Sequence, residues 1–326
     1  MTRAARPRPR ARRAPLPAPY EKGRHSRMTS APARPVDLYP TRGPEEVLVG
    51  RKDPVVWSEP GTPGPFWARE LEAYERDGFV TVDELVSPGE VAALRDELDR
   101  LVSDPRVRED ERAVLEPRSR EIRSVFEVHR ISEVFARLAA DPRVLGRARQ
   151  ILGSEVYVHQ SRVNVKPGFG AHGFSWHSDF ETWHAEDGLP RMRTVSVSIA
   201  LTPNHTTNGS LMIMPGSHRT FLGCAGATPE DNYKTSLRMQ DAGTPSDEAL
   251  TTFAEACGIR HLTGPAGSAT WFDCNAMHGS GDNITPYPRS NVFLVFNSVE
   301  NRPELPFAAP VRRPSFIAAR DATPLG

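Results

Sequence analysis

Two side chains in the aromatic stretch Phe174 to Pro190 (FSWHSDFETWHAEDGLP) could bind a metal ion. His177 and Asp179 are two residues apart, and on an extended strand such side chains point to the same face. An imidazole and a carboxylate that project together are two of the three ligands of the 2-His-1-carboxylate triad, which holds Fe(II) with open coordination positions. His278, in a later loop of small residues before a predicted strand, is expected to be the third ligand.

A plainer interpretation of these three residues is open at this point. A His-x-Asp pair is common, Asp179 could cap a helix, and His177 could lie at the surface while His278 packs in the core. The spacing alone does not favour the metal over this alternative.

Arg289 follows His278 at the start of the next predicted strand. A guanidinium there could bind the distal carboxylate of a 2-oxo acid on the metal through two charge-assisted hydrogen bonds. Asn291 lies two residues further on and shares that face of the strand. The alternative for Arg289 is an exposed charge at a strand edge.

Polar residues share one face of the predicted strand from Glu155 to Lys166. Gln160, Asn164 and Lys166 could line a cavity for a charged ligand, or they could form a solvated face. Trp183 could pack in the core, or it could cover a planar or cationic ligand.

The segment from Thr194 to Thr202 alternates between apolar and small polar residues, as half-buried strands do. The small residues are Thr194, Ser196, Ser198 and Ala200. Their face suits a strand that lines a ligand cavity, and it would equally suit a strand facing solvent.

Composition excludes several classes of protein. No apolar run approaches the ~20 residues that span a bilayer, so no membrane partner is expected. Cys224, Cys257 and Cys274 form no CxxC motif, which indicates a reducing compartment and no disulfide framework. Residues 1–27 contain nine Arg and Lys against one Glu, so 32 of the 41 basic and 40 of the 41 acidic residues remain in the acidic body. Such a body is not expected to bind nucleic acid.

The order of predicted elements indicates the fold class. Helices are expected at 66–76, after the capping box Ser87-Pro88-Gly89-Glu90, from Asp141 to Gly153, and at 246–257. Strands are expected at 78–82, 155–166, 194–202, 210–214, 268–272 and 290–298, with an Asn208-Gly209 hairpin turn. Helices first and many short strands later predict a mainly β fold with flanking helices, a double-stranded β-helix or jelly-roll, cupin-like core.

We expect one domain. Residues 1–35, rich in Arg and Pro, are interpreted as a disordered leader, with Met28 as an alternative start. Residues 36–326 are expected to form a single domain, with a helical N-terminal part and a jelly-roll from about residue 155.

The stretch from Phe174 to Pro190 resembles the signature of the ectoine hydroxylases, a branch of the phytanoyl-CoA dioxygenase-like Fe(II)/2-oxoglutarate oxygenases. The residues Asn208-Gly209-Ser210-Leu211 and Pro215-Gly216-Ser217-His218 are similar to the hallmark of the wider superfamily. The similarity runs from about Asp37 to near the C-terminus. It implies conversion of ectoine to 5-hydroxyectoine, both compatible solutes, with O2 and 2-oxoglutarate consumed and succinate and CO2 released.

The resemblance also implies roles for particular residues. His177, Asp179 and His278 would bind iron; Lys166, Arg289, Asn164, Phe174, Ser196 and Asn291 would surround 2-oxoglutarate; Gln160 and Trp183 would contact ectoine. A cytoplasmic homodimer is implied as well. Two alternatives are a related oxygenase acting on another small amino-acid-like substrate, and a catalytically silent jelly-roll that senses a solute or a metal.

Overall fold

The computed structural model describes residues 36–116, 120–169, 171–237 and 242–326, and its main element is a seven-stranded antiparallel sheet. The expected leader, residues 1–35, lies outside this range. In spatial order the sheet contains β2 (Phe79–Val82), β11 (Ala269–Asp273), β7 (Thr194–Ala200), β13 (Arg289–Ser298), β5 (Val156–Lys166), β4 (Ile122–Phe126) and β3 (Ala113–Leu115). Strands distant in sequence are therefore neighbours at its centre.

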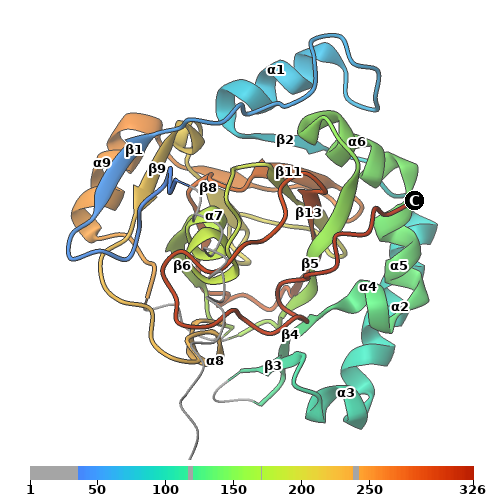
Figure 1. The fold of residues 1–326 in the computed structure, drawn as a ribbon. Helices are drawn as coiled ribbons and strands as arrows, with labels where there is room; N and C mark the ends of the chain where they lie inside the picture. Colours follow the sequence, from blue (N-terminus) through green and yellow to red (C-terminus); the bar gives the residue numbers. More distant parts are fainter. Residues whose placement is uncertain (1–35, 117–119, 170, 238–241) are drawn as a thin grey trace, which may run out of the picture. The chain divides into compact units, whose positions relative to one another are not determined.

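A second antiparallel sheet has four shorter strands and carries part of the site. Its order is β10 (Arg260–Leu262), β8 (Leu211–Ile213), β12 (His278–Ser280) and β6 (Phe174–His177). A two-stranded sheet pairs β1 (Val47–Gly50) with β9 (Thr220–Gly223). The large and the small sheet form the predicted jelly-roll core with flanking helices (Figure 1).

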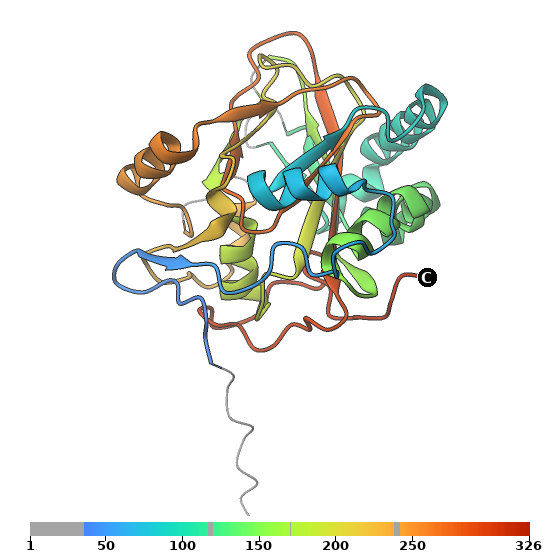
Figure 2. The same ribbon diagram turned by 90° about the horizontal axis from the view of Figure 1, so that it is seen from above.

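Helices cover the outer face of the large sheet. They are α1 (Ala68–Asp77), α2 (Pro88–Ser103), α3 (Pro105–Glu109), α4 (Val128–Ile131), α5 (Glu133–Ala140) and α6 (Pro142–Leu152). Figure 2 shows α2 to α6 gathered on one side of the strands, away from α9 (Asp247–Cys257). Apolar residues of these helices form one core cluster with Val195, Val197 and Ile199 of β7. The opposite face of β7 is therefore free to line the interior.

The predicted helix ends are confirmed where capping chemistry specified them. At the start of α2, the Glu90 carboxylate accepts a hydrogen bond from Ser87 N–H at 2.7 Å, and Ser87 Oγ accepts one from Glu90 N–H. At the end of α6, Gly153 adopts a left-handed conformation with φ of 59°. The predicted helix at 246–257 corresponds to α9, with Ser246 as its N-cap.

The predicted hairpin at Asn208-Gly209 is wrong. The strands on either side, β7 and β8, belong to different sheets, so the turn connects two sheets. The Asn208 side chain organises the turn by accepting from His205 N–H at 2.8 Å and donating to the carbonyl oxygen of Pro203 at 3.0 Å. A tight turn sequence does not specify whether its strands pair with each other.

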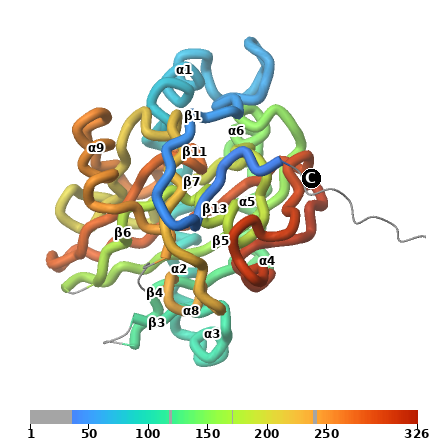
Figure 3. The backbone as a smooth tube through the Cα atoms, turned by 60° about the vertical axis from the view of Figure 1, so that its left-hand side comes forward, coloured from blue at the N-terminus to red at the C-terminus, as the bar shows by residue number. Residues whose placement is uncertain are grey.

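Extended segments complete the unit formed by residues 37–326. The segment 37–66 runs across the strands of the large sheet and is irregular except for the short β1 (Figure 3). The segment 301–326 is also without regular strands. Among the described residues, no helix has both the length and the apolar composition to cross a bilayer.

Candidate metal centre and active site

His177 and His278 come together because their strands pair. They are direct partners in the antiparallel ladder of β6 and β12, and their ring centroids lie 4.3 Å apart. Side chains that face each other across such a ladder project to the same face of the sheet. The pairing of β6 with β12 therefore brings together two histidines that are about a hundred residues apart in the sequence.

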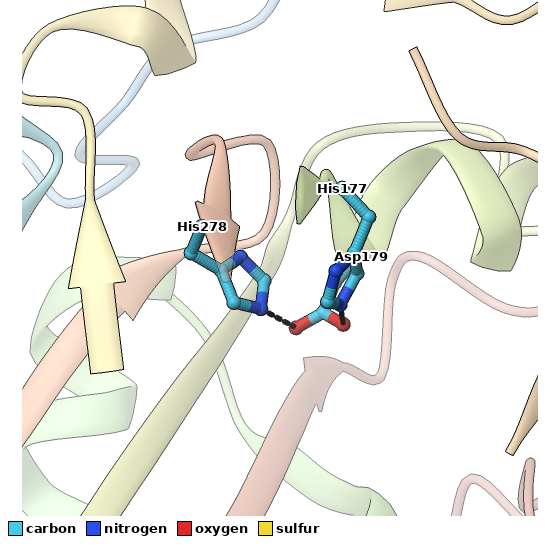
Figure 4. Close-up of side chains that lie close together, drawn as sticks. All are labelled: His177, Asp179 and His278. Atoms are coloured by element: carbon cyan, nitrogen blue, oxygen red, sulfur yellow. Dashed lines mark ion pairs between the residues drawn. The ribbon is translucent and has the colours of Figure 1, made fainter. Parts of the chain in front are cut away.

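Asp179 completes the cluster, but not from the strand that the sequence predicted. Strand β6 ends at His177, and Asp179 is the first residue of the short helix α7 (Asp179–Thr182). Ser178 between them is extended, with φ of −106° and ψ of 128°, so the two side chains still project together. Asp179 Oδ1 lies 3.7 Å from His177 Nε2, and Oδ2 lies 3.9 Å from His278 Nε2 (Figure 4).

Backbone hydrogen bonds orient both imidazole rings. Nδ1 of His177 lies 2.7 Å from the Ser175 carbonyl oxygen, and Nδ1 of His278 lies 2.9 Å from that of Ala276. Because a carbonyl only accepts, each Nδ1 carries the proton and each Nε2 presents a lone pair toward the carboxylate. Both rings are therefore oriented so that Nε2 could bind a metal ion.

The electrostatics of the cluster suit a divalent cation. Burial raises the pKa of Asp179, but the electrostatic effect of the neighbouring imidazoles, that of His278 above all, outweighs burial, so the pKa of Asp179 lies below its usual range. Burial, reinforced by His177, lowers the pKa of His278 to about 4. At neutral pH the site thus offers a carboxylate and a neutral imidazole.

The donor set fits Fe(II). Ligand atoms of the three residues all lie within 4.8 Å of one another. Two imidazole nitrogens and one carboxylate on one side of a metal form the facial triad of non-haem iron oxygenases. The plainer interpretation, with His177 at the surface and Asp179 as a simple cap, does not describe this arrangement.

Arg289 and Lys166 lie together at one end of the large sheet. They are direct partners in the ladder of β13 and β5, and their exposed fractions are only 5% and 4%. Nη1 of Arg289 donates to the Gly209 carbonyl oxygen at 3.0 Å, and Nζ of Lys166 donates to that of Gly281 at 2.8 Å. Arg289 is therefore not the exposed edge charge that the sequence also allowed.

Buried polar atoms in this region have unused hydrogen-bonding capacity. Among the described residues, Nε of Arg289 and Oδ1 of Asn291 have no hydrogen-bond partner. Burial lowers the pKa of Arg289 to about 10, and burial with the charges of Arg289 and Arg123 lowers that of Lys166 to about 7. Two buried cations without a carboxylate partner are costly, and an anionic ligand would offset that cost.

The polar residues of β5, β7 and β13 lie side by side on one buried face of the large sheet. Asn164 is the ladder partner of Asn291, and it accepts a hydrogen bond from Ser124 Oγ at 2.8 Å. Asn291 Nδ2 donates to Ser198 Oγ at 2.9 Å, and Ser196 Oγ donates to Asp179 Oδ2 at 3.4 Å. The solvated alternative for these strand faces is wrong.

A cleft opens beside the metal centre and encloses about 530 Å³, including space open to solvent. Gln160, Phe174 and Trp183 line it together with His177 and Asp179. Trp183 is only 2% exposed, and it packs edge-on against His159 with ring centroids 5.6 Å apart. The structure thus brings Gln160 and Trp183, the expected substrate contacts, into one cleft with His177 and Asp179.

Three further charged residues line the cleft, and sequence reasoning missed them: Arg162, Glu186 and Arg313. Arg162 could have been found, because it shares the strand parity of Gln160 and Asn164 in β5. Glu186 lies in the π-helix η1 (Trp183–Asp187), and Arg313 lies in the extended C-terminal segment. No local pattern marks those two.

Comparison with known proteins identifies the family. The phytanoyl-CoA dioxygenase (PhyH) family model matches residues 74–291. The ectoine dioxygenase of Streptomyces anulatus is 73% identical over 289 residues, which are 89% of this chain and 97% of that protein. The ectoine dioxygenase of Streptomyces coelicolor is 70% identical and is covered over its full length by 91% of this chain.

Solved structures agree with this assignment. EctD from S. alaskensis in its apo form superposes with a TM-score of 0.80 at 48% identity, covering 89% of this chain and 97% of that one. The same protein with 2-oxoglutarate and 5-hydroxyectoine gives a TM-score of 0.80 at 46% identity, over 89% of this chain and all of the other. The chain therefore belongs to the phytanoyl-CoA dioxygenase family, within its group of ectoine dioxygenases.

Proposed function

We propose that this protein is an Fe(II)/2-oxoglutarate-dependent dioxygenase that hydroxylates ectoine to 5-hydroxyectoine. The observation that carries the proposal is the convergence of His177, Asp179 and His278 beside a cleft lined by Arg162, whose Nε has no partner among the described residues. The high identity to ectoine dioxygenases and the superposition on a structure with 2-oxoglutarate and 5-hydroxyectoine support it. The reaction would contribute to the synthesis of a compatible solute.

The three clustered residues would hold the iron. His177 and His278 donate through Nε2, and Asp179 contributes its carboxylate, which stays ionised at neutral pH. When bound, Fe(II) with 2-oxoglutarate and O2 supplies the oxidant that inserts one oxygen atom into a C–H bond, with release of succinate and CO2. A carboxylate at Asp179 leaves no extra ligand position for halide, which favours hydroxylation over halogenation.

Arg289 and Lys166 would bind 2-oxoglutarate through its distal carboxylate. Both are buried and have no carboxylate partner within the described part of the chain, so a dicarboxylate would offset the cost of their burial. Four residues would shape the rest of this subsite: Asn164, Phe174, Ser196 and Asn291. In this subsite, Oδ1 of Asn291 and Nε of Arg289 have no partner among the described residues and are available to a ligand.

Ectoine would lie in the cleft beside the iron ligands. Gln160 and Trp183 are placed to contact it, and Trp183 offers a flat apolar surface for the ring. Arg162 would bind the ectoine carboxylate, because its guanidinium lies over the rings of Phe126 and Phe293 and its Nε has no partner among the described residues. Fixing the carboxylate orients the ring above the metal.

We also propose that residues 36–326 act as one dioxygenase domain in a cytoplasmic homodimer, without a nucleic-acid or membrane partner. Free Cys224, Cys257 and Cys274 support a reducing environment. Light scattering on the purified protein gives its mass in solution, and the mass of one chain would contradict the dimer.

The proposed function is tested by incubating the protein with ectoine, Fe(II), 2-oxoglutarate, ascorbate and O2. Mass spectrometry should detect a product with one added oxygen atom, formed together with an equal amount of succinate. Proline serves as the control substrate and should not stimulate succinate formation. Oxidation of proline but not ectoine would point to the related oxygenase with another substrate, and binding of ectoine without turnover would point to the sensor.

A further inference from the structure

Glu186 places a buried carboxylate in the wall of the cleft. Neither the proposed iron site nor the proposed 2-oxoglutarate site uses this carboxylate. The side chain of Glu186 is 3% exposed, and the residue lines the cleft in η1. Oε1 accepts a hydrogen bond from the Asn232 amide at 2.7 Å and lies 3.4 Å from Nη2 of Arg42. A neutral amide therefore makes the short contact, and a guanidinium makes the long one.

Arg42 is already neutralised by a different carboxylate. Its Nε donates to Glu181 Oε1 at 2.5 Å, and its Nη2 donates to Glu181 Oε2 at 2.9 Å. This is the forked, two-bond geometry in which a guanidinium and a carboxylate pair most strongly. Arg42 and Glu181 form a neutral pair, and Glu186 receives only a single, longer contact from Arg42.

A second buried arginine in the wall of the cleft is paired in the same way. Arg313 donates through Nε and Nη2 to both oxygens of Asp187, at 2.8 and 2.5 Å. Arg162 has no such fork, and its Nε lacks a partner among the described residues. Among the described residues that line the cleft, Arg162 is thus a cation without a carboxylate partner, and Glu186 is an anion without a two-bond arginine partner.

We propose that Glu186 binds the cationic amidinium edge of ectoine and makes the cleft selective for a zwitterionic ring. This rests on the proposed function, which places ectoine in the cleft with its carboxylate on Arg162. A ring N–H of the amidinium donates a charge-assisted hydrogen bond to the Glu186 carboxylate. The ligand also offsets the cost of burying that carboxylate next to an incomplete counter-charge.

The test compares two ligands that differ in ring charge. Ectoine carries the amidinium, whereas hexahydro-2-oxopyrimidine-4-carboxylate is a neutral cyclic urea with the same ring size and carboxylate. Calorimetry on the iron-loaded protein with 2-oxoglutarate, without O2, measures both affinities. The wild type should bind ectoine more tightly than the urea, and Glu186→Gln should weaken ectoine binding about 10- to 100-fold. Binding of the urea should change by less than about 3-fold.

The control variant is Asp53→Asn, which also replaces a buried carboxylate paired with an arginine. Asp53 contacts Arg191 and the Tyr39 hydroxyl and does not line the cleft. Asp53→Asn should lower thermal stability without changing the ratio of the affinities for ectoine and the cyclic urea. This separates the loss of a buried charge from the loss of a contact to the ligand.

Three results are distinguishable. If the wild type does not bind ectoine, the proposed function is refuted, and the role of Glu186 is refuted with it. If the wild type binds ectoine but Glu186→Gln weakens both ligands equally, Glu186 only holds Asn232 and Arg42, and this inference alone is overturned. Should Glu186→Gln not fold, equal wild-type affinities for ectoine and the urea would overturn it as well.

Discussion

Replacement of Arg289 by alanine tests the assignment of the 2-oxoglutarate subsite. The side chain is 5% exposed, donates once to the Gly209 carbonyl oxygen and keeps Nε unpaired. Removing one partner of a buried, hydrogen-bonded charge pair costs about 3–4 kcal/mol. Because each 1.4 kcal/mol is a factor of ten, the KM for 2-oxoglutarate should rise roughly 100- to 1000-fold.

The assay measures succinate while either 2-oxoglutarate or ectoine is varied and the other is saturating. The KM for ectoine should change by less than about 3-fold in Arg289→Ala, since Arg289 does not line the cleft. Arg137→Ala is the control, because that arginine is 70% exposed and pairs with Glu133 on the surface of α5. An equal rise in both KM values would refute the assignment of Arg289 to 2-oxoglutarate.

Three more predictions follow from the same site. Burial lowers the pKa of Lys166 to about 7, so without 2-oxoglutarate the lysine loses its positive charge as the pH rises through 7. Because 2-oxoglutarate favours the protonated lysine, the affinity for 2-oxoglutarate should fall from pH 6.5 to 8.5, and binding should take up protons. A calorimetric proton count of zero across this range would contradict the prediction. Gly209→Ala should raise the KM for 2-oxoglutarate and lower Tm, because φ at Gly209 is +72° and the new Cβ would lie 2.9 Å from Lys166 Nζ. Gly216→Ala is the control and should lower Tm alone, because φ at Gly216 is +83° but its Cβ would meet open space. Similar KM values in both variants would argue against the contact with Lys166. Asp179→Ala should abolish hydroxylation with the fold retained, as judged by turnover and circular dichroism, and normal turnover would exclude Asp179 as a ligand.

The sequence was sufficient to predict that His177, Asp179 and His278 come together as a group, because most of that arrangement is local. His177 and Asp179 are neighbours in the chain, and a short extended link at Ser178 is enough to bring them together. Only the pairing of β6 with β12 had to bring in His278. The strand position of Asp179 was wrong, since a residue two positions after a strand residue can equally begin a helix.

The periodicity of β5 also predicted a polar face, but it did not settle whether that face was buried. Burial depends on the neighbouring strands β4 and β13, and their pairing is a long-range property of the sheet. The same holds for Asn208-Gly209, where local turn chemistry is correct but the strand pairing is not. Glu186 and Arg313 were missed because their ion-pair partners, Arg42 and Asp187, come from distant segments of the chain.

The most direct test of the metal centre is an anaerobic titration of the protein with Fe(II) in the presence of 2-oxoglutarate, followed by visible absorption. The wild type should develop a metal-to-ligand charge-transfer band that saturates at one equivalent of iron. Asp179→Ala and His278→Ala should show no band at the same iron concentration. A band of full intensity in either variant, or none in the wild type, would contradict the assignment of these side chains to a single ferrous ion.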